Sequence, residues 1–136
     1  NGLGVANDVA KEIFKLQQEK IEGLILDLRN NGGGSMKEAI TLSGMFIDKG
    51  PISIVKTHKG NISTLRDPYR GKVFEKPLLI LVNQFSASAS ELFAGAMQDY
   101  HRAIIVGSPT YEKSTVQSIF PLDQNGELGF SKITIQ

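Results

Sequence analysis

Three serines stand at alternate positions in residues 83–100, which read NQFSASASELFAGAMQDY. They are Ser86, Ser88 and Ser90, and an amphipathic helical pattern follows them directly. Ser88 and Glu91 have the Ser-x-x-Glu spacing of a helix capping box. The same position suits a nucleophile, because the unpaired N–H groups at a helix start can stabilise an oxyanion. Spacing alone leaves both roles open, so a partner base must decide between them.

The two histidines are poor candidates for that base. His101 would lie about 20 Å from Ser88 along the predicted helix, at ~1.5 Å of rise per residue, and His58 lies in a polar loop. A lysine can act at neutral pH if burial lowers its pKa from ~10.4 by about three units. Lys113 has the most suitable surroundings, since it lies in PTYEKSTVQSIFPL, between a tyrosine-containing loop and an apolar strand.

Composition limits the class of protein. The 136 residues are 40% hydrophobic, which is enough for one domain with a core. The formal net charge of +1, with basic residues spread along the chain, argues against nucleic acid as a partner. The absence of cysteine excludes disulfides and zinc-thiolate sites, and two isolated histidines do not form a metal cluster alone. The longest apolar run, residues 77–82, is far shorter than the ~20 residues of a membrane span.

The hydrophobic pattern predicts a strand, a turn and a helix, and then the same unit again. In the first unit a buried strand covered on both faces precedes the turn RNNGGG and a helix with a Ser35–Glu38 capping box. Gly50 and Pro51 are expected to stop that helix. The first unit comprises a strand over 23–28 and a helix from 35, preceded by a helix over 7–21 capped by Asn7 or Asp8.

The second unit follows a strand over 52–57 and a polar excursion over 58–76 that suggests a hairpin. Its buried strand over 77–83 leads through the serines into a helix over 88–100, and a third buried strand covers 102–107. Alternating strands are expected at 116–122 and 126–135, around a turn at 123–126. The pattern therefore predicts an α/β domain whose sheet contains parallel strands. Both ends of the chain suggest a fragment of a longer protein.

Three ordered motifs resemble a known family: GLILDLRNNGGG, LLILVNQFSASASELFAGAMQDYHRAIIVG and PTYEKSTVQ. They are similar to those of the C-terminal processing or tail-specific proteases, serine peptidase family S41, from about Glu22 to the end of the chain. The resemblance implies a ClpP/crotonase-like fold of stacked β-β-α units. It also implies the catalytic core of a serine endopeptidase that cleaves proteins near their C-termini without metal or cofactor.

The resemblance also assigns roles to individual residues. It implies that Ser88 is the nucleophile, Lys113 the general base, and Gln117 the residue that orients the lysine. The implied oxyanion donors are the N–H groups of Ala89 and of the glycine turn, Gly33 or Gly34. Positions that the family associates with activity are matched by Glu91, Asp99 and Thr110. Asp99 opposes the dipole at a helix C-terminus, so a structural tether is the expected role there.

The chain departs from the family around the base. Where the family usually has Phe-Gly-Lys-Gly, this chain has Tyr111, Glu112, Lys113 and Ser114. A glutamate beside the lysine is expected to pair with it and raise its pKa. The replaced glycines are expected to stiffen the loop.

The resemblance further implies what accompanies residues 1–136 in the full-length protein. Family members carry a PDZ domain that captures substrate C-termini, and no PDZ sequence is present here. Bacterial members mostly act outside the cytoplasm, which implies a periplasmic or membrane-associated extracytoplasmic location. Two other functions stay open: a non-catalytic binding domain on the same fold, with Ser88 only a cap, and a crotonase-like acyl-CoA enzyme with a glycine-lined oxyanion hole.

Overall fold

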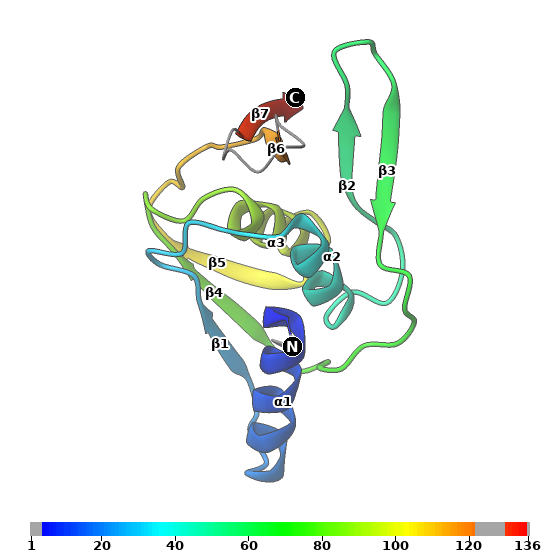
Figure 1. The fold of residues 1–136 in the computed structure, drawn as a ribbon. Coiled ribbons are helices and arrows are strands. Elements are labelled where there is room, and N and C mark those ends of the chain that lie inside the picture. The colour runs from blue at the N-terminus through cyan, green and yellow to red at the C-terminus, as the bar shows by residue number, and fades with distance from the viewer. Residues whose placement is uncertain (1–3, 122–129, 136) are drawn as a thin grey trace.

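The computed structural model describes residues 4–121 and 130–135 and has a mixed α/β fold (Figure 1). Three parallel strands form the central sheet in the order β1-β4-β5. They are β1 (Leu24–Asp27), β4 (Leu78–Val82) and β5 (Ala103–Gly107). The three strands begin at the same level of the sheet, because Leu24 lies opposite Leu78 and Leu78 lies opposite Ala103. The predicted α/β class with parallel strands is confirmed.

Three helices bury one face of this sheet: α1 (Val5–Gln18), α2 (Met36–Gly44) and α3 (Ala89–Asp99). Three phenylalanines centre the core, with Phe46 edge-to-face on both Phe74 and Phe93. Such aromatic contacts add to the apolar burial. Around them, the most deeply buried aliphatic side chains come from α1, β4 and α3: Ile13, Ile80 and Met97.

The other face of the sheet corrects a prediction. The three strands were expected to be buried, β1 on both faces, but Ile25 of β1 is 66% exposed and Ile104 of β5 is 67% exposed. The helices contact the alternate residues, so burial follows the two-residue period of a strand. A short run that is apolar at every position does not reveal which face the helices cover.

The helix starts show which caps form. Ser35 caps α2 as predicted, since its Oγ accepts a hydrogen bond from the Glu38 N–H at 3.4 Å. The predicted caps of the first helix, Asn7 and Asp8, are wrong, because α1 begins earlier, after Gly4, which has no side-chain cap. The Glu38 carboxylate instead accepts the Ala6 N–H at 2.9 Å. A distant residue therefore supplies the cap that the local sequence was expected to supply.

The helix ends also differ from prediction. α1 stops at Gln18 and not at Ile21. α2 ends at Gly44 and does not reach Gly50, because the following amides form the tighter i→i+3 hydrogen bonds, Met45 to Leu42 and Phe46 to Ser43. α3 matches its predicted range to within one residue at each end.

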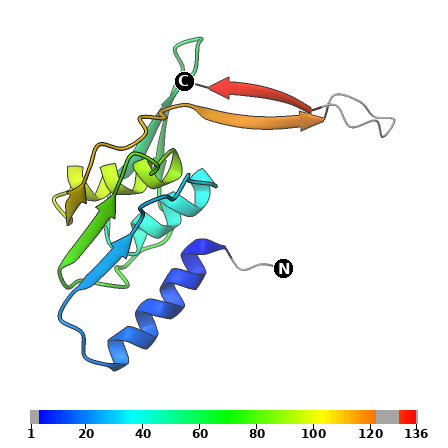
Figure 2. The ribbon, with the colours of Figure 1, turned by 90° about the vertical axis from the view of Figure 1, so that its left-hand side faces the viewer.

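Two antiparallel hairpins complete the described structure. One pairs β2 (Pro51–Lys56) with β3 (Ile62–Arg66), and the other pairs β6 (Val116–Pro121) with β7 (Phe130–Ile135). The second hairpin was predicted, and its expected turn at 123–126 lies outside the described residues. The first was expected within residues 58–76, but β3 pairs back with the preceding strand, β2. The hairpins lie beyond α3, on its side away from the three-stranded sheet (Figures 1 and 2). They therefore flank the helix that follows the serines.

Candidate active site

The turns after β1 and β4 are bonded to each other. These strands are parallel neighbours, so their carboxyl ends bring both turns to one edge of the sheet. Asn83 Oδ1 accepts the Asn30 N–H at 2.9 Å, and Asn83 Nδ2 donates to Asn30 Oδ1 at 3.0 Å. The Ala87 N–H donates to the Asn31 carbonyl at 3.0 Å. The glycine turn is thus fixed against the serine turn.

Two of the three serines form part of this connection. Ser86 is fully buried, and its Oγ donates to the Leu28 carbonyl at 2.7 Å and accepts the Asn83 N–H at 3.0 Å. The buried Ser90 Oγ donates to Asn31 Oδ1 at 2.9 Å. These hydroxyls satisfy buried polar groups. Of the three serines, only Ser88 lines the pocket described below.

Ser88 has an unusual backbone conformation, with φ 56° and ψ −115°. A positive φ costs a residue with a side chain on the order of 1 kcal/mol or more, and such strain gathers at functional turns. The serine and Glu91 have the proximity of a capping box, but Ser88 Oγ makes no well-formed capping hydrogen bond to the helix. The glutamate half is a full hydrogen bond, with the Ser88 N–H donating to Glu91 Oε2 at 2.7 Å, while the Ser88 side chain faces the Glu91 N–H only in the looser geometry of the box. The Ser88 hydroxyl therefore makes at most a weak contact with the helix start.

Glu91 connects the serine turn to the loop that carries Lys113. Its Oε2 also accepts the Lys113 N–H at 2.9 Å, while its Oε1 accepts the Thr110 hydroxyl at 2.6 Å and the Glu112 N–H at 2.5 Å. Burial alone would raise the pKa of Glu91, but the hydrogen bonds from Thr110, Ser88, Glu112 and Lys113 outweigh it and lower the pKa. An ionised carboxylate thus holds two chain segments together, and Glu91 and Thr110 are in direct contact.

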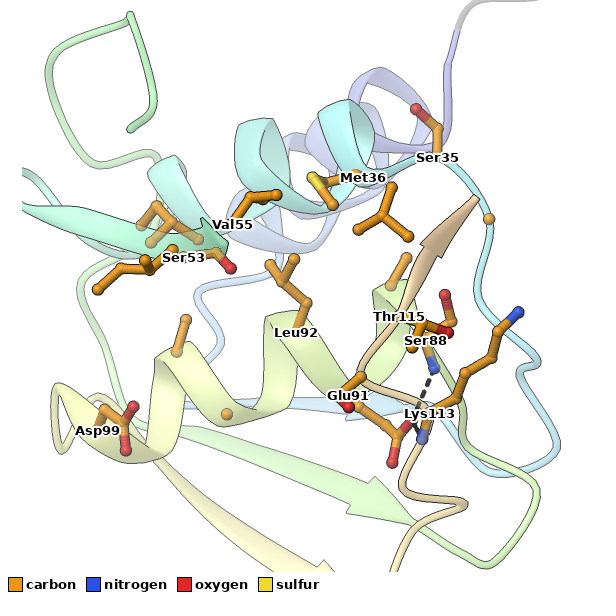
Figure 3. Close-up of a pocket in the computed structure, with 18 of the residues that line it drawn as sticks. Ser35, Met36, Ser53, Val55, Ser88, Glu91, Leu92, Asp99, Lys113 and Thr115 are labelled. Atoms are coloured by element: carbon orange, nitrogen blue, oxygen red, sulfur yellow. Dashed lines mark hydrogen bonds between the residues drawn. The ribbon is translucent and has the colours of Figure 1, made fainter. Parts of the chain in front are cut away.

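A pocket of about 1140 Å³ runs along α3 from this junction. Its lining includes the residues that the sequence analysis grouped as nucleophile, base, lysine partner and two oxyanion donors: Ser88, Lys113, Gln117, Ala89 and Gly34. Figure 3 shows the Ser88 and Lys113 side chains at one end and Asp99 at the other. The structure therefore places Ser88 and Lys113 close together, with the other three lining the same pocket, and separates Asp99 from Ser88 by about 16 Å of helix rise at ~1.5 Å per residue. Asp99 has no hydrogen-bond or ion-pair partner within residues 4–117, so the expected tether is not seen there.

The loop around Lys113 differs from its expected arrangement. The lysine is half-buried, but within the described chain no ion pair joins it to Glu112, whose side chain is exposed. Glu112 has φ 66°, in the left-handed region that favours glycine. This conformation explains why a glycine suits the position. Within the part described, Ser88 Oγ and Lys113 Nζ are not hydrogen-bonded; such contacts tighten in many enzymes only when substrate binds.

The glycine turn approaches the serine closely enough to exclude a side chain. A Cβ on Gly33 would lie 2.5 Å from the Ala87 carbonyl oxygen and 2.9 Å from Ser88 Cβ, and Gly33 has φ 89°. The Gly33 N–H donates to Asn31 Oδ1 at 3.0 Å. The N–H groups of Gly34 and Ala89 meet no acceptor among the described residues. Ala89 is the first residue of α3, where an amide has no partner within the helix.

The asparagines that join the turns were not identified from the sequence. A signal was present, because Asn30, Asn31 and Asn83 follow two predicted strands, and asparagine favours turns with local side-chain bonds. Neither histidine lines the pocket. Among the described residues there is no group of His, Cys, Asp or Glu side chains that could hold a metal ion, and no helix there could span a membrane.

Comparison with known proteins supports this architecture. Residues 2–135 match the model of peptidase family S41. A tail-specific protease of Haemophilus influenzae is 44% identical over 140 aligned positions, covering 98% of this chain and 20% of the relative. A carboxy-terminal-processing protease of Bartonella bacilliformis is 43% identical over 115 positions, covering 84% and 26% respectively. The chain thus spans roughly a fifth to a quarter of the length of these relatives.

A solved structure leads to the same assignment. The photosystem II D1 C-terminal processing protease superposes with a TM-score of 0.74 at 32% identity, covering 84% of this chain and 30% of that one. The S41 protease fold, a mixed α/β fold with a parallel sheet, is therefore shared. With the family model matched over nearly the whole sequence, this chain belongs to peptidase family S41.

Proposed function

We propose that this chain is the catalytic core of a serine endopeptidase that cleaves proteins near their C-termini by a Ser-Lys mechanism. One observation carries the proposal: Ser88 occupies a strained turn at the same pocket end as Lys113, and both backbones bond to Glu91. A structural cap needs no strained backbone and no pocket. The names of the similar proteases support the same reaction class.

In the proposed reaction, the neutral Lys113 amine accepts the Ser88 hydroxyl proton as Ser88 Oγ attacks the scissile carbonyl carbon. The carbonyl oxygen becomes an oxyanion and accepts hydrogen bonds from the Ala89 and Gly34 N–H groups. Of the two glycines considered, Gly34 is favoured, because the Gly33 N–H already bonds to Asn31.

The remaining steps return the site to its starting state. The lysine ammonium gives its proton to the leaving amine as the peptide C–N bond breaks and an acyl-enzyme forms. Water then attacks the acyl-enzyme, with Lys113 as base, and releases the carboxylic acid and the Ser88 hydroxyl. Gln117 orients the lysine through its amide oxygen without adding charge, whereas a carboxylate there would raise the lysine pKa.

The full-length context is part of the proposal. Residues 1–136 form a single domain of the protease core, and a PDZ domain elsewhere in the full-length chain captures substrate C-termini. The catalytic step uses no metal, and the protein acts on the extracytoplasmic side, in the periplasm or at the membrane. The lengths of the relatives leave room for such additional domains.

The test uses the full-length protein and an unfolded protein substrate with an apolar C-terminus. We expect Ser88→Ala and Lys113→Ala each to abolish cleavage between pH 6 and 9, while the melting temperature changes little. Ser63→Ala and Lys59→Ala are matched controls on the exposed β2–β3 hairpin and are expected to cleave normally. Cleavage that survives both site substitutions would contradict the mechanism.

One observation favours a second candidate, a binding domain on the same fold. It is the missing hydrogen bond between the Ser88 hydroxyl and the Lys113 amine within the described structure. A wild-type protein that binds the apolar-tailed substrate tightly but never cleaves it would favour this function.

A further inference from the structure

Gly95 is a glycine in the middle of α3 for which the fold gives no packing reason. Glycine inside a helix costs about 1 kcal/mol relative to alanine. A Cβ added at Gly95 would meet no heavy atom within 4 Å. The other helical glycine, Gly44 at the end of α2, is different, because a Cβ there would overlap the Asp67 carboxylate. Packing thus accounts for Gly44 and leaves Gly95 unexplained.

The open space above Gly95 belongs to the pocket along α3. Leu92, three residues before Gly95, and Asp99, four residues after it, line the same pocket, and Met36 and Val55 contribute apolar walls from α2 and β2 (Figure 3). Residues three and four apart share one face of a helix. At Gly95 the pocket floor carries no side chain, and apolar side chains stand around it.

The distance from the reacting serine fixes which part of a substrate reaches this space. Gly95 lies seven residues after Ser88, or about 10 Å of rise at ~1.5 Å per residue. An extended peptide advances about 3.3 Å per residue. A substrate held at Ser88 and running along α3 thus places a side chain over Gly95 about three residues from the scissile bond.

The β2 strand supports an extended substrate in this position. Five consecutive residues, 51–55, line the pocket. A strand that presents its face contributes alternate residues, whereas one that presents its edge contributes consecutive ones. β2 pairs with β3 on one side only in the described structure, so its other edge can accept an added strand.

We propose that Gly95 forms the floor of a size-selective subsite for a bulky apolar side chain about three residues from the scissile bond. The inference rests on the proposed protease function. The missing Cβ leaves room for the substrate side chain, and Leu92, Met36 and Val55 surround it with apolar surface. On this proposal, glycine at position 95 lowers the stability of α3 and in return gives the pocket its substrate selectivity.

The experiment compares the full-length wild type with Gly95→Leu, using peptides that carry Phe or Ala at each position from four before to four after the scissile bond. We expect the wild type to show a Phe-over-Ala ratio of kcat/KM above tenfold at a single position about three residues from the bond. Gly95→Leu is expected to reduce that ratio at least about tenfold. Gln98→Leu, on the exposed side of α3 and outside the pocket, is the control and should keep the ratio.

Gly95→Ala provides a second test, in which stability and selectivity should change in opposite directions. Alanine should raise the melting temperature, because nothing obstructs its methyl group and helix propensity improves. The Phe-over-Ala ratio should nevertheless fall. If the Gly95 variants slow both peptides equally, or the wild type shows no preference at that distance, the subsite does not exist.

Binding separates failure of this inference from failure of the protease function. In a Ser88→Ala background, fluorescence anisotropy measures the Kd of the labelled Phe and Ala peptides without turnover. A Phe preference that Gly95→Leu removes supports the subsite even if the wild type never cleaves. Equal affinities of the Ser88→Ala protein for both peptides overturn the subsite even if the wild type is an active protease.

Discussion

Two turns in this molecule have the same sequence motif and use it differently. Both turns follow a strand and read Ser-x-x-Glu. Ser35 precedes α2 and Glu38 lies in its first turn, and Ser88 and Glu91 have the same positions at α3. Ser35 has an ordinary extended backbone, φ −71° and ψ 124°, and its hydroxyl caps the helix. Ser88 has a positive φ and makes no such cap. The motif therefore predicts a helix start in both places but not what the serine does there.

The glutamates differ as well. Glu38 accepts the Ala6 N–H and thereby joins α2 to the start of α1. Glu91 accepts hydrogen bonds from the serine turn and from the loop that carries Lys113. Neighbouring segments thus decide whether a capping glutamate joins two helices or joins a helix start to a distant loop.

The largest expected effect separates the two serines. Ser88→Ala should lower kcat/KM by at least about 10³-fold, because the proposed nucleophile is lost, with little change in stability. Ser35→Ala should lower the free energy of unfolding by about 0.5–2 kcal/mol through loss of the cap. Peptide cleavage and urea unfolding of both variants test this contrast. Equal activity loss in the two variants would show that the two turns are equivalent.

The glutamates should show the next largest contrast. Glu91→Gln replaces one acceptor oxygen with an NH₂ group that faces N–H donors, so the turn and loop should shift. A displacement of about 1 Å in an active site can cost on the order of 10²-fold in rate. We expect a loss of that size in kcat for Glu91→Gln, with KM less affected. Glu38→Gln should leave kcat near that of the wild type, and steady-state kinetics distinguishes the outcomes.

Acid should reveal the charge on Glu91. Its pKa in the folded protein lies below the ordinary 4.5, so the carboxylate stabilises the fold above that value and this contribution is lost as the pH falls through the folded pKa. The difference in unfolding free energy between wild type and Glu91→Gln, about 1–3 kcal/mol at pH 7, should shrink in acid. Urea titrations from pH 7 to 3 measure it. A constant difference would mean that the charge of Glu91 is not involved.

The smallest effect concerns the loop around the base. Glu112→Gly should remove the strain of a left-handed φ at Glu112 and raise stability by up to about 1 kcal/mol, partly offset by the added freedom of the unfolded chain. Ser114→Gly is the matched control, because Ser114 has no positive φ, and it should give no gain. A melting-temperature rise in Ser114→Gly that equals the rise in Glu112→Gly would remove strain as the explanation.

The sequence predicted the features that depend on local pattern. The strand–turn–helix units, the β6–β7 hairpin and the Ser35 cap follow from periodicity and cap chemistry over a few residues. The local context of Lys113 made it the best candidate base, but its pairing with Ser88, 25 positions away, depended on resemblance to the family. The exposed face of β1 and β5, the cap from Glu38 and the Asn30–Asn83 pair depend on tertiary contacts. Such contacts leave no periodic trace in one sequence.

The Asn30–Asn83 pair also connects a step of folding, the pairing of β1 with β4, to assembly of the turn that carries Ser88. The two asparagines are 53 positions apart and meet only after β1 and β4 have paired in parallel. Parallel pairing requires closure of a long loop and is therefore intrinsically slow. A chain still emerging from the ribosome, with β4 not yet made, has no assembled serine turn. For a proposed protease, assembly of the turn that carries Ser88 is therefore tied to the pairing of β1 with β4.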